Sequence, residues 1–137
     1  MIELRPMTEE EFDTLKASMY ASYPEERAKA SGGVVTQEDI EVGKRQIDEL
    51  MSESIHSKAH HYWKMVAPEV GVVGDLWVFV DDAKRRGFIY FIGTDEAYRG
   101  QGYGQQALEA LEVAMRPLGV TQIGLNVWGD NTVARRL

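Results

Sequence analysis

Three glycines alternate with other residues between an arginine and a helix-like run, and residues at this spacing could bind an anion. The segment reads TDEAYRGQGYGQQALEAL, residues 94–111, with Gly100, Gly102 and Gly104 alternating. Glycines let a backbone turn so that successive N–H groups point to one side. The start of the following helix adds unpaired donors and the positive end of its dipole. Together they predict an anion site that a pyrophosphate would fit, with Arg99 at its rim.

A turn that binds nothing is the alternative for this segment, but three alternate glycines would then weaken helix initiation for no gain. Two nucleotide-binding motifs also fit badly. The dinucleotide motif G-x-G-x-x-G follows its strand directly, whereas TDEAYR separates these glycines from the preceding strand-like run. The Walker motif ends in Gly-Lys-Ser/Thr, whereas Gly104 is followed by two glutamines. Both motifs are therefore excluded.

The elements that must position this segment follow from the hydrophobic periodicity of the chain. Alternating or β-rich runs predict strands over residues 2–6, 61–67, 72–82, 87–94 and 122–128, of which the first is ended by Pro6. Capping residues and three-and-four spacing predict helices from Thr8 to about Tyr20, from Thr36 to about Ser54, after Gly104 to about Pro117, and over residues 131–137. Residues 23–35, with Pro24 and two glycines, are expected to form a loop or a broken helix.

The spacing of apolar residues also predicts which of them face the core. In the first helix these are Phe12, Leu15 and Met19; in the second, Ile40, Ile47, Leu50 and Met51; in the third, Ala107, Leu108, Leu111, Met115 and Leu118. Short connections between the middle strands favour an antiparallel meander. The expected fold is α/β in a single domain, residues 1–137. Its mixed, mostly antiparallel central sheet is flanked by helices in the order β-α-α-β-β-β-α-β-α.

Composition narrows the classes of function. The net charge of −7 disfavours a protein that tracks nucleic-acid phosphates. The absence of cysteine excludes disulfides, thiolate zinc sites and a cysteine nucleophile, and the histidines form no convincing metal site. No secretory signal or run of about 18 apolar residues is visible. We therefore expect a cytoplasmic protein without a metal, a membrane partner or a nucleic-acid partner.

The sequence of residues 99–104, RGQGYG, resembles the Arg/Gln-x-x-Gly-x-Gly/Ala pyrophosphate loop of the GNAT superfamily, the Gcn5-related N-acetyltransferases. The flanking TDEAY and QQALEAL are also similar to that family's acyl-CoA motif. The later block LNVWGDNTVARRL resembles its second motif, in which an asparagine is followed by Ala-x-x-Leu. The resemblance covers most of the chain and is strongest from Phe88 onward.

The resemblance implies an enzyme that transfers an acetyl group from acetyl-CoA to a primary amine by direct attack in a ternary complex. The coenzyme arm would pair with the fourth strand, and a main-chain N–H near Ile92 or Thr94 would polarise the thioester carbonyl. The residues that the resemblance places along the coenzyme are Ile92, Gly93, Thr94, Arg99, Gly100, Gln101, Gly102, Tyr103, Gly104, Gln105 and Asn131.

Two departures from the family pattern leave the catalytic groups open. The family often carries a carboxylate on its fourth strand, but Phe91 and Gly93 occupy the matching positions here. The general base is therefore unknown. The residues that could replace the missing carboxylate as the base are Asp75, Glu69, His60 and His61. The family's general-acid tyrosine would stand just after Leu137, where this chain stops, so we expect the C-terminal strands to be missing.

These departures support an alternative function, a non-catalytic acyl-CoA-binding or interaction module on a degenerate acetyltransferase fold. By the resemblance, the amine acceptor is selected by the first helices and the loop between them, here residues 20–54, where no signature is recognisable. Homodimers are common in the family, so a homodimer is a possible assembly.

Overall fold

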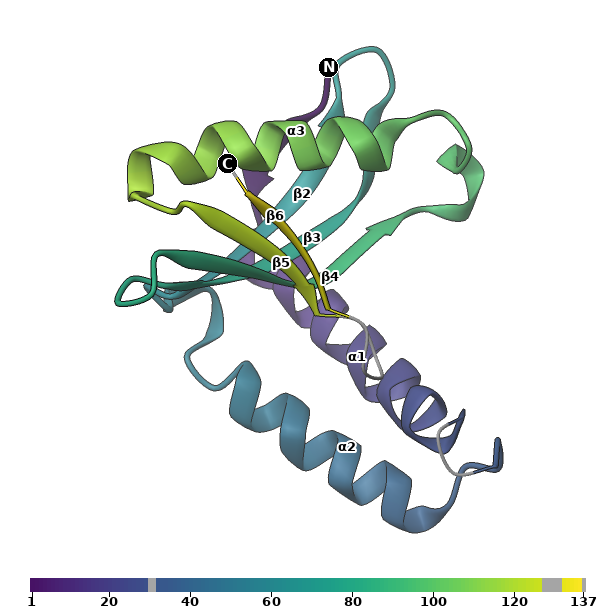
Figure 1. Cartoon of the computed structure of the whole chain (residues 1–137). Coiled ribbons are helices and arrows are strands. Elements are labelled where there is room, and N and C mark those ends of the chain that lie inside the picture. Colours follow the sequence, from purple (N-terminus) through teal and green to yellow (C-terminus); the bar gives the residue numbers. More distant parts are fainter. Residues whose placement is uncertain (30–31, 127–131, 137) are drawn as a thin grey trace. The chain divides into compact units, whose positions relative to one another are not determined.

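The computed structural model describes residues 1–29, 32–126 and 132–136. The elements in order are β1 (Glu3–Pro6), α1 (Glu9–Lys29), α2 (Gln37–Leu50), β2 (His60–Ala67), β3 (Gly71–Asp81), β4 (Arg86–Thr94), α3 (Tyr103–Met115), β5 (Gln122–Asn126) and β6 (Thr132–Arg136) (Figure 1). They form two compact units. The sheet unit holds residues 1–7, 57–126 and 132–136, and the helical unit holds residues 8–29 and 32–56.

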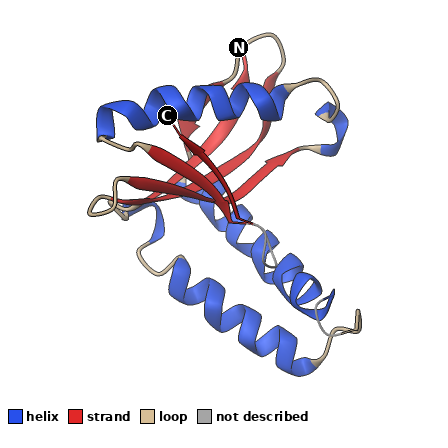
Figure 2. Cartoon of the chain, viewed as in Figure 1, coloured by secondary structure: helices blue, strands red, loops and turns tan. Residues whose placement is uncertain are grey.

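The sheet unit is built on one sheet whose strands lie in chain order, β1 to β6. Neighbouring strands from β1 to β4 are antiparallel, as the short connections predict. The connection through α3 makes β5 parallel to β4, and β6 returns antiparallel to β5. The expected α/β fold with a mixed, mostly antiparallel sheet is confirmed (Figure 2).

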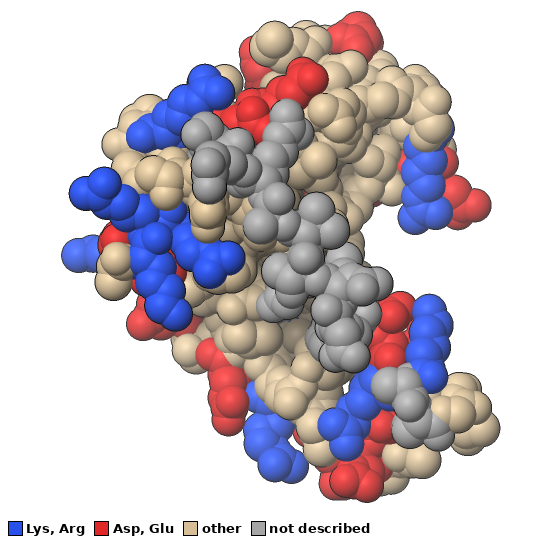
Figure 3. All heavy atoms as spheres, in the orientation of Figure 1, with Lys and Arg blue, Asp and Glu red and all other residues tan. Residues whose placement is uncertain are grey.

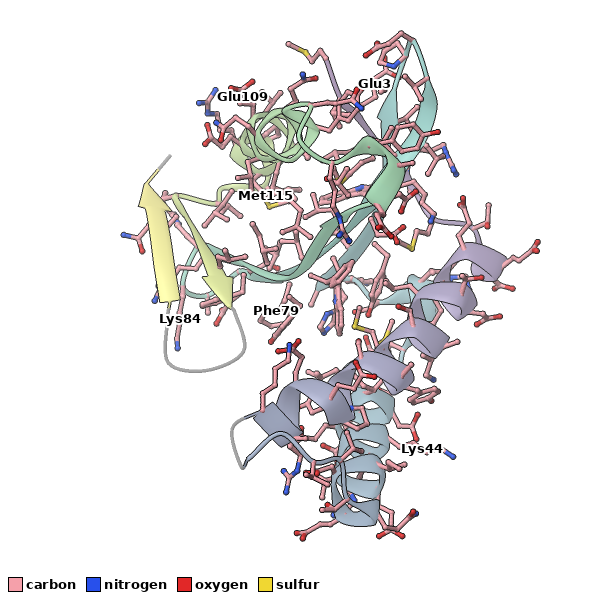
Figure 4. The ribbon with its side chains drawn as sticks, turned by 90° about the vertical axis from the view of Figure 1, so that its right-hand side faces the viewer. Glu3, Lys44, Phe79, Lys84, Glu109 and Met115 are labelled. Atoms are coloured by element: carbon pink, nitrogen blue, oxygen red, sulfur yellow. The ribbon has the colours of Figure 1, made fainter. Side chains whose placement is uncertain are left out.

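The two faces of the sheet carry different side chains. Helix α3 lies across one face (Figure 1), and its residues Ala107, Leu111 and Met115 are fully buried in the core there. Figure 4 shows Met115 between α3 and the sheet, with Phe79 on the opposite face. The rings that contact one another on that opposite face, the aromatic face, are those of His60, Tyr62, Trp77, Phe79 and Tyr90. One face is thus filled by α3, and the other presents the aromatic side chains.

Helix α1 is longer than the sequence predicts. It runs to Lys29, so the residues expected to form a loop from position 23 onward continue the helix as far as that residue. Pro24 lies inside the helix and is buried. Proline lacks an N–H and so removes one bond of the helical ladder. The burial of Pro24 and of Ala28 shows that packing outweighs that loss in this helix.

Three further predictions are corrected. The helix expected over residues 131–137 is wrong, because Thr132–Arg136 form strand β6. The β-branched Thr132 and Val133 favour a strand, and so short a helix would be marginal. Ile40 and Leu118 were expected in the core but are 45% and 49% exposed. Ile40 lies in the first turn of α2, and Leu118 lies in a 3-10 turn after α3, where the helical spacing that predicted its burial no longer applies.

The predicted start of α2 at Thr36 is confirmed. Thr36 and Asp39 form a capping box, in which the Thr36 hydroxyl accepts a bond from the Asp39 N–H and the Asp39 carboxylate accepts one from the Thr36 N–H. Arg27 of α1 donates to the same buried carboxylate at 2.9 Å. The hydrogen bond from the Thr36 backbone, then those from its hydroxyl and from Arg27, hold the pKa of Asp39 below its ordinary value. One ionised carboxylate therefore ties α2 to α1.

Replacing Thr36 with alanine is expected to lower the free energy of unfolding by about 1 kcal/mol, because the first turn of α2 loses its capping hydroxyl. Urea denaturation followed by circular dichroism measures the loss. The matched control is Thr14→Ala, which removes a hydroxyl that bonds to the Glu10 carbonyl within α1. Since alanine is the better helix former, this control should not destabilise the protein. Equal stability of Thr36→Ala and the wild type would contradict the role of the cap.

His61 should make stability depend on pH near neutrality. Its ring stacks on Trp63, and burial lowers the pKa of His61 below its ordinary 6.5, opposed by the charge of Asp82. Between the folded pKa and 6.5 the unfolded chain holds more protons, so stability rises with pH there. This contribution is complete above pH 6.5 and falls away as the pH drops through that value. Urea midpoints at pH 7.5 and 5.5 should therefore differ more for the wild type than for His61→Gln. Equal differences in the two proteins would argue against this role of His61.

Candidate functional site

The predicted anion cradle lies between β4 and α3. Gly100 and Gly102 adopt positive φ angles of 77° and 84°, which glycine alone adopts readily. Gly102 is the N-cap of α3 and has no side chain to accept a bond from the first turn. The amides of Tyr103, Gly104 and Gln105 therefore begin the helix without a capping side chain, and they are donors for an anion.

Two side chains tie the cradle to its surroundings in the sheet unit. The Arg99 Nε donates to the Thr94 carbonyl at 3.1 Å, so this arginine joins the cradle to the last residue of β4. The Tyr103 hydroxyl donates to Glu69 of the β2–β3 turn at 3.5 Å. Burial, and then the charge of Glu69, raises the pKa of Tyr103, so its hydroxyl keeps its proton.

The second part of the site is an open edge of β4. Strand β5 pairs with residues 86–89 of β4, whereas β3 pairs with β4 as far as Thr94. Within the described part of the chain, no strand pairs with the outer edge of residues 90–94. The β3–β4 register shifts at Trp77, where Tyr90 is left without a partner, which is a β-bulge. The structure thus contains an unpaired strand edge where the resemblance predicts one.

Ile92 and Thr94 share that open edge. The Thr94 carbonyl bonds to Arg99 and so lies outside the ladder with β3. In an extended strand the N–H and C=O of one residue point to the same side, and residues two apart repeat that direction. The N–H groups of Ile92 and Thr94 therefore face the edge, while those of Phe91 and Gly93 face β3.

The four replacement bases lie in different places. Asp75 pairs with Gly93 in the register of β3 and β4, and it forms an ion pair with Lys64 of β2 at 2.5 Å. His60, on the aromatic face, accepts a hydrogen bond at Nδ1 from the Trp77 indole at 3.0 Å. Glu69 bonds to Tyr103, and His61 pairs with Val78, which belongs to the α3 core. Of the four, Asp75 alone lies opposite the coenzyme edge.

Surface charge and potential metal ligands do not help to locate the site. On the surface in view, several Lys and Arg side chains gather at the left-hand side (Figure 3). Among the residues that the structure describes, no three His, Asp or Glu side chains gather as they would around a metal ion. Within the same ranges, no helix combines the length and apolar character of a membrane span.

The comparisons with known proteins decide the family. The model of the acetyltransferase (GNAT) family matches residues 17–137. The chain is 35% identical over 139 residues to YycN of Bacillus subtilis (strain 168), described as an uncharacterized N-acetyltransferase, and the match covers 99% of this chain and 88% of that protein. The chain belongs to the GNAT family. As a GNAT acetyltransferase it is an enzyme of acetyl transfer.

Solved structures agree with this assignment. The crystal structure of Bacillus subtilis YycN superposes with a TM-score of 0.84 at 33% identity, covering 96% of this chain and 84% of that one. The PaiA N-acetyltransferase of Thermoplasma acidophilum, solved in complex with coenzyme A, superposes with a TM-score of 0.59 at 19% identity. That match covers 93% of this chain and 79% of the PaiA chain, and at this identity it shows a shared fold.

The predicted coenzyme residues are thus largely brought together in one unit of this GNAT acetyltransferase. Ile92, Gly93 and Thr94 end β4, residues 99–102 lie in the connection that follows, and residues 103–105 begin α3. Asn131 lies outside the described residues. Sequence reasoning missed the bulge at Tyr90 and a close approach between Gly74 and Gly93. No local motif signals either feature, because both depend on how two strands pair.

Proposed function

We propose that the chain transfers an acetyl group from acetyl-CoA to a primary amine by direct attack in a ternary complex. The observation that carries the proposal is that the cradle and the open edge of β4 are directly joined in the structure. Residues 95–98 connect them, and the side chain of Arg99 in the cradle donates to the Thr94 carbonyl at the end of β4. A long ligand with a pyrophosphate at one end and an amide-bearing arm at the other would fit this arrangement.

The chemistry asked of the protein is modest. The amine nitrogen forms a bond to the thioester carbon, the carbon–sulfur bond breaks, and the coenzyme leaves as a thiolate that takes up a proton. The outward N–H of Thr94 or Ile92 would donate to the carbonyl oxygen as negative charge develops on it. A group that removes a proton from the attacking ammonium is also required, and Asp75, which pairs with Gly93 in the register of β3 on β4, is our candidate.

Calorimetry with acetyl-CoA and with coenzyme A is the first test, and both are expected to bind. Thiol release with a panel of primary amines then tests turnover. Initial rates measured at several concentrations of both substrates should give intersecting lines, as a ternary complex requires, whereas parallel lines would indicate a covalent acyl-enzyme. A protein that binds neither ligand would refute the proposal.

A non-catalytic acyl-CoA-binding module is the second candidate, and the composition of β4 favours it. Phe91 and Gly93 leave β4 without a carboxylate at the positions where the family often has one. Binding of acetyl-CoA without thiol release across the whole amine panel would support the module over the enzyme.

A further inference from the structure

Gly74 of β3 approaches the end of β4 unusually closely. A Cβ atom at position 74 would overlap the carbonyl oxygen of Gly93, and it would also lie 3.1 Å from both the Gly93 carbonyl carbon and the Met65 sulfur. Because backbone atoms cannot swing aside as a flexible side chain can, an alanine here would displace β4 itself. The carbonyl of Gly93 therefore occupies space that only glycine leaves free.

The position of this carbonyl sets the direction of the next amide. The peptide bond between Gly93 and Thr94 is planar and trans, so its C=O and N–H point in opposite directions. With the Gly93 oxygen turned toward Gly74 on β3, the Thr94 N–H must point away from β3, toward the edge that β5 leaves unpaired.

Two other contacts hold the same stretch from either side. The Asp95 N–H donates to the Val73 carbonyl at 2.7 Å, next to Gly74 on β3. The Thr94 carbonyl accepts from Arg99 at 3.1 Å. The Gly93–Thr94 peptide is thus fixed at its C-terminal side by hydrogen bonds, while at Gly93 it is accommodated by the missing side chain of Gly74.

We propose that Gly74 is a positioning residue for the coenzyme arm: by leaving room for the Gly93 carbonyl, it aims the Thr94 N–H at the thioester end of acetyl-CoA. The inference rests on the proposed function, since it assigns a role to the edge at which that function places the arm. The cradle at residues 99–105 does not include Gly74, so the two parts of the site can be tested separately.

The test compares two ligands on Gly74→Ala. Acetyl-CoA reaches both the cradle and the open edge, whereas 3′-phospho-ADP, the nucleotide part of the coenzyme, lacks the arm and reaches the cradle only. Calorimetry should show acetyl-CoA binding about tenfold or more weaker in Gly74→Ala, because one or two hydrogen bonds of the arm are lost. Binding of 3′-phospho-ADP should stay at the wild-type value.

The matched control is Gly87→Ala at the far end of β4, where a Cβ would meet Met115, Ile123 and Val120 at 3.6–3.7 Å, which is ordinary contact. Both ligands should bind this control as they bind the wild type. Unchanged acetyl-CoA affinity in Gly74→Ala would overturn the proposal, and so would equal weakening of both ligands, since Gly74 would then serve the fold as a whole. A wild type that binds neither ligand would instead refute the proposed function.

Amide hydrogen exchange in the wild type keeps the proposal testable if Gly74→Ala does not fold. The Thr94 N–H should exchange rapidly in the free protein, because it faces the open edge, and it should become protected when coenzyme A is added. Slow exchange of the Thr94 N–H in the free protein, as in a paired strand, would overturn the proposed orientation.

Discussion

Replacing Gly104 with alanine is expected to stabilise the fold while weakening acetyl-CoA binding about tenfold or more. Gly104 lies in the first turn of α3, its φ is not positive, and nothing stands within 4 Å of a Cβ built there. Alanine is the better helix former by roughly 0.5–1 kcal/mol, so the free protein should gain stability. If the proposed cradle binds the pyrophosphate, however, a methyl group would stand where the pyrophosphate approaches the backbone amides.

The opposite signs of these two effects make the test sharp. Urea denaturation measures the stability, and calorimetry measures the affinity for acetyl-CoA. Val113→Ala is the matched control, because Val113 is an exposed residue on the same helix beyond its first turns and should leave binding unchanged. If Gly104→Ala bound acetyl-CoA as tightly as the wild type, the pyrophosphate would not sit on the first turn of α3.

The parts of the fold that local rules govern could be predicted from the sequence. The strands of the meander follow from periodicity and from turn residues within a few positions of each other. So does the helix predicted after Gly104, which begins at Tyr103 in the structure. The cradle is equally local, since φ angles that favour glycine and a helix start lie within one connection. The conformation of residues 99–105 therefore depends on residues close in the sequence, which a local motif can describe.

Predictions failed where tertiary packing outweighs local preference. Pro24 signals a break, yet α1 continues through it because Pro24 itself and Ala28, one turn further on, are buried. The last five described residues could be read as a short helix from their caps, but pairing with β5 makes them strand β6. Both errors come from contacts with residues distant in the sequence.

In the candidate site, too, some features follow from the local sequence and others from contacts between distant residues. Sequence resemblance placed the coenzyme arm on Ile92–Thr94, but the two features that shape this edge come from strand pairing. The bulge at Tyr90 and the approach of Gly74 to Gly93 follow from the register of β3 on β4. Gly74 is about 20 residues from its partner, so a search for local motifs does not find it.

Replacing Thr94 with proline should abolish most of the acetyl transfer while leaving the sheet intact. Proline removes the N–H, and a strand tolerates this loss where the N–H faces outward from an edge. The residue before it, Gly93, accepts the extended conformation that a following proline imposes. If the Thr94 N–H stabilises the developing negative charge, the turnover number should fall about a hundredfold to a thousandfold.

Thr94→Ala is the comparison for this variant, because it removes the side chain but keeps the amide. The ratio of the two turnover numbers then isolates the contribution of the N–H. Calorimetry with 3′-phospho-ADP, which would occupy the cradle alone, checks that the proline variant is folded at residues 99–105. Similar turnover in Thr94→Pro and Thr94→Ala would assign the oxyanion donor to another group, and the Ile92 N–H, which faces the same edge, would be the next to test by Ile92→Pro.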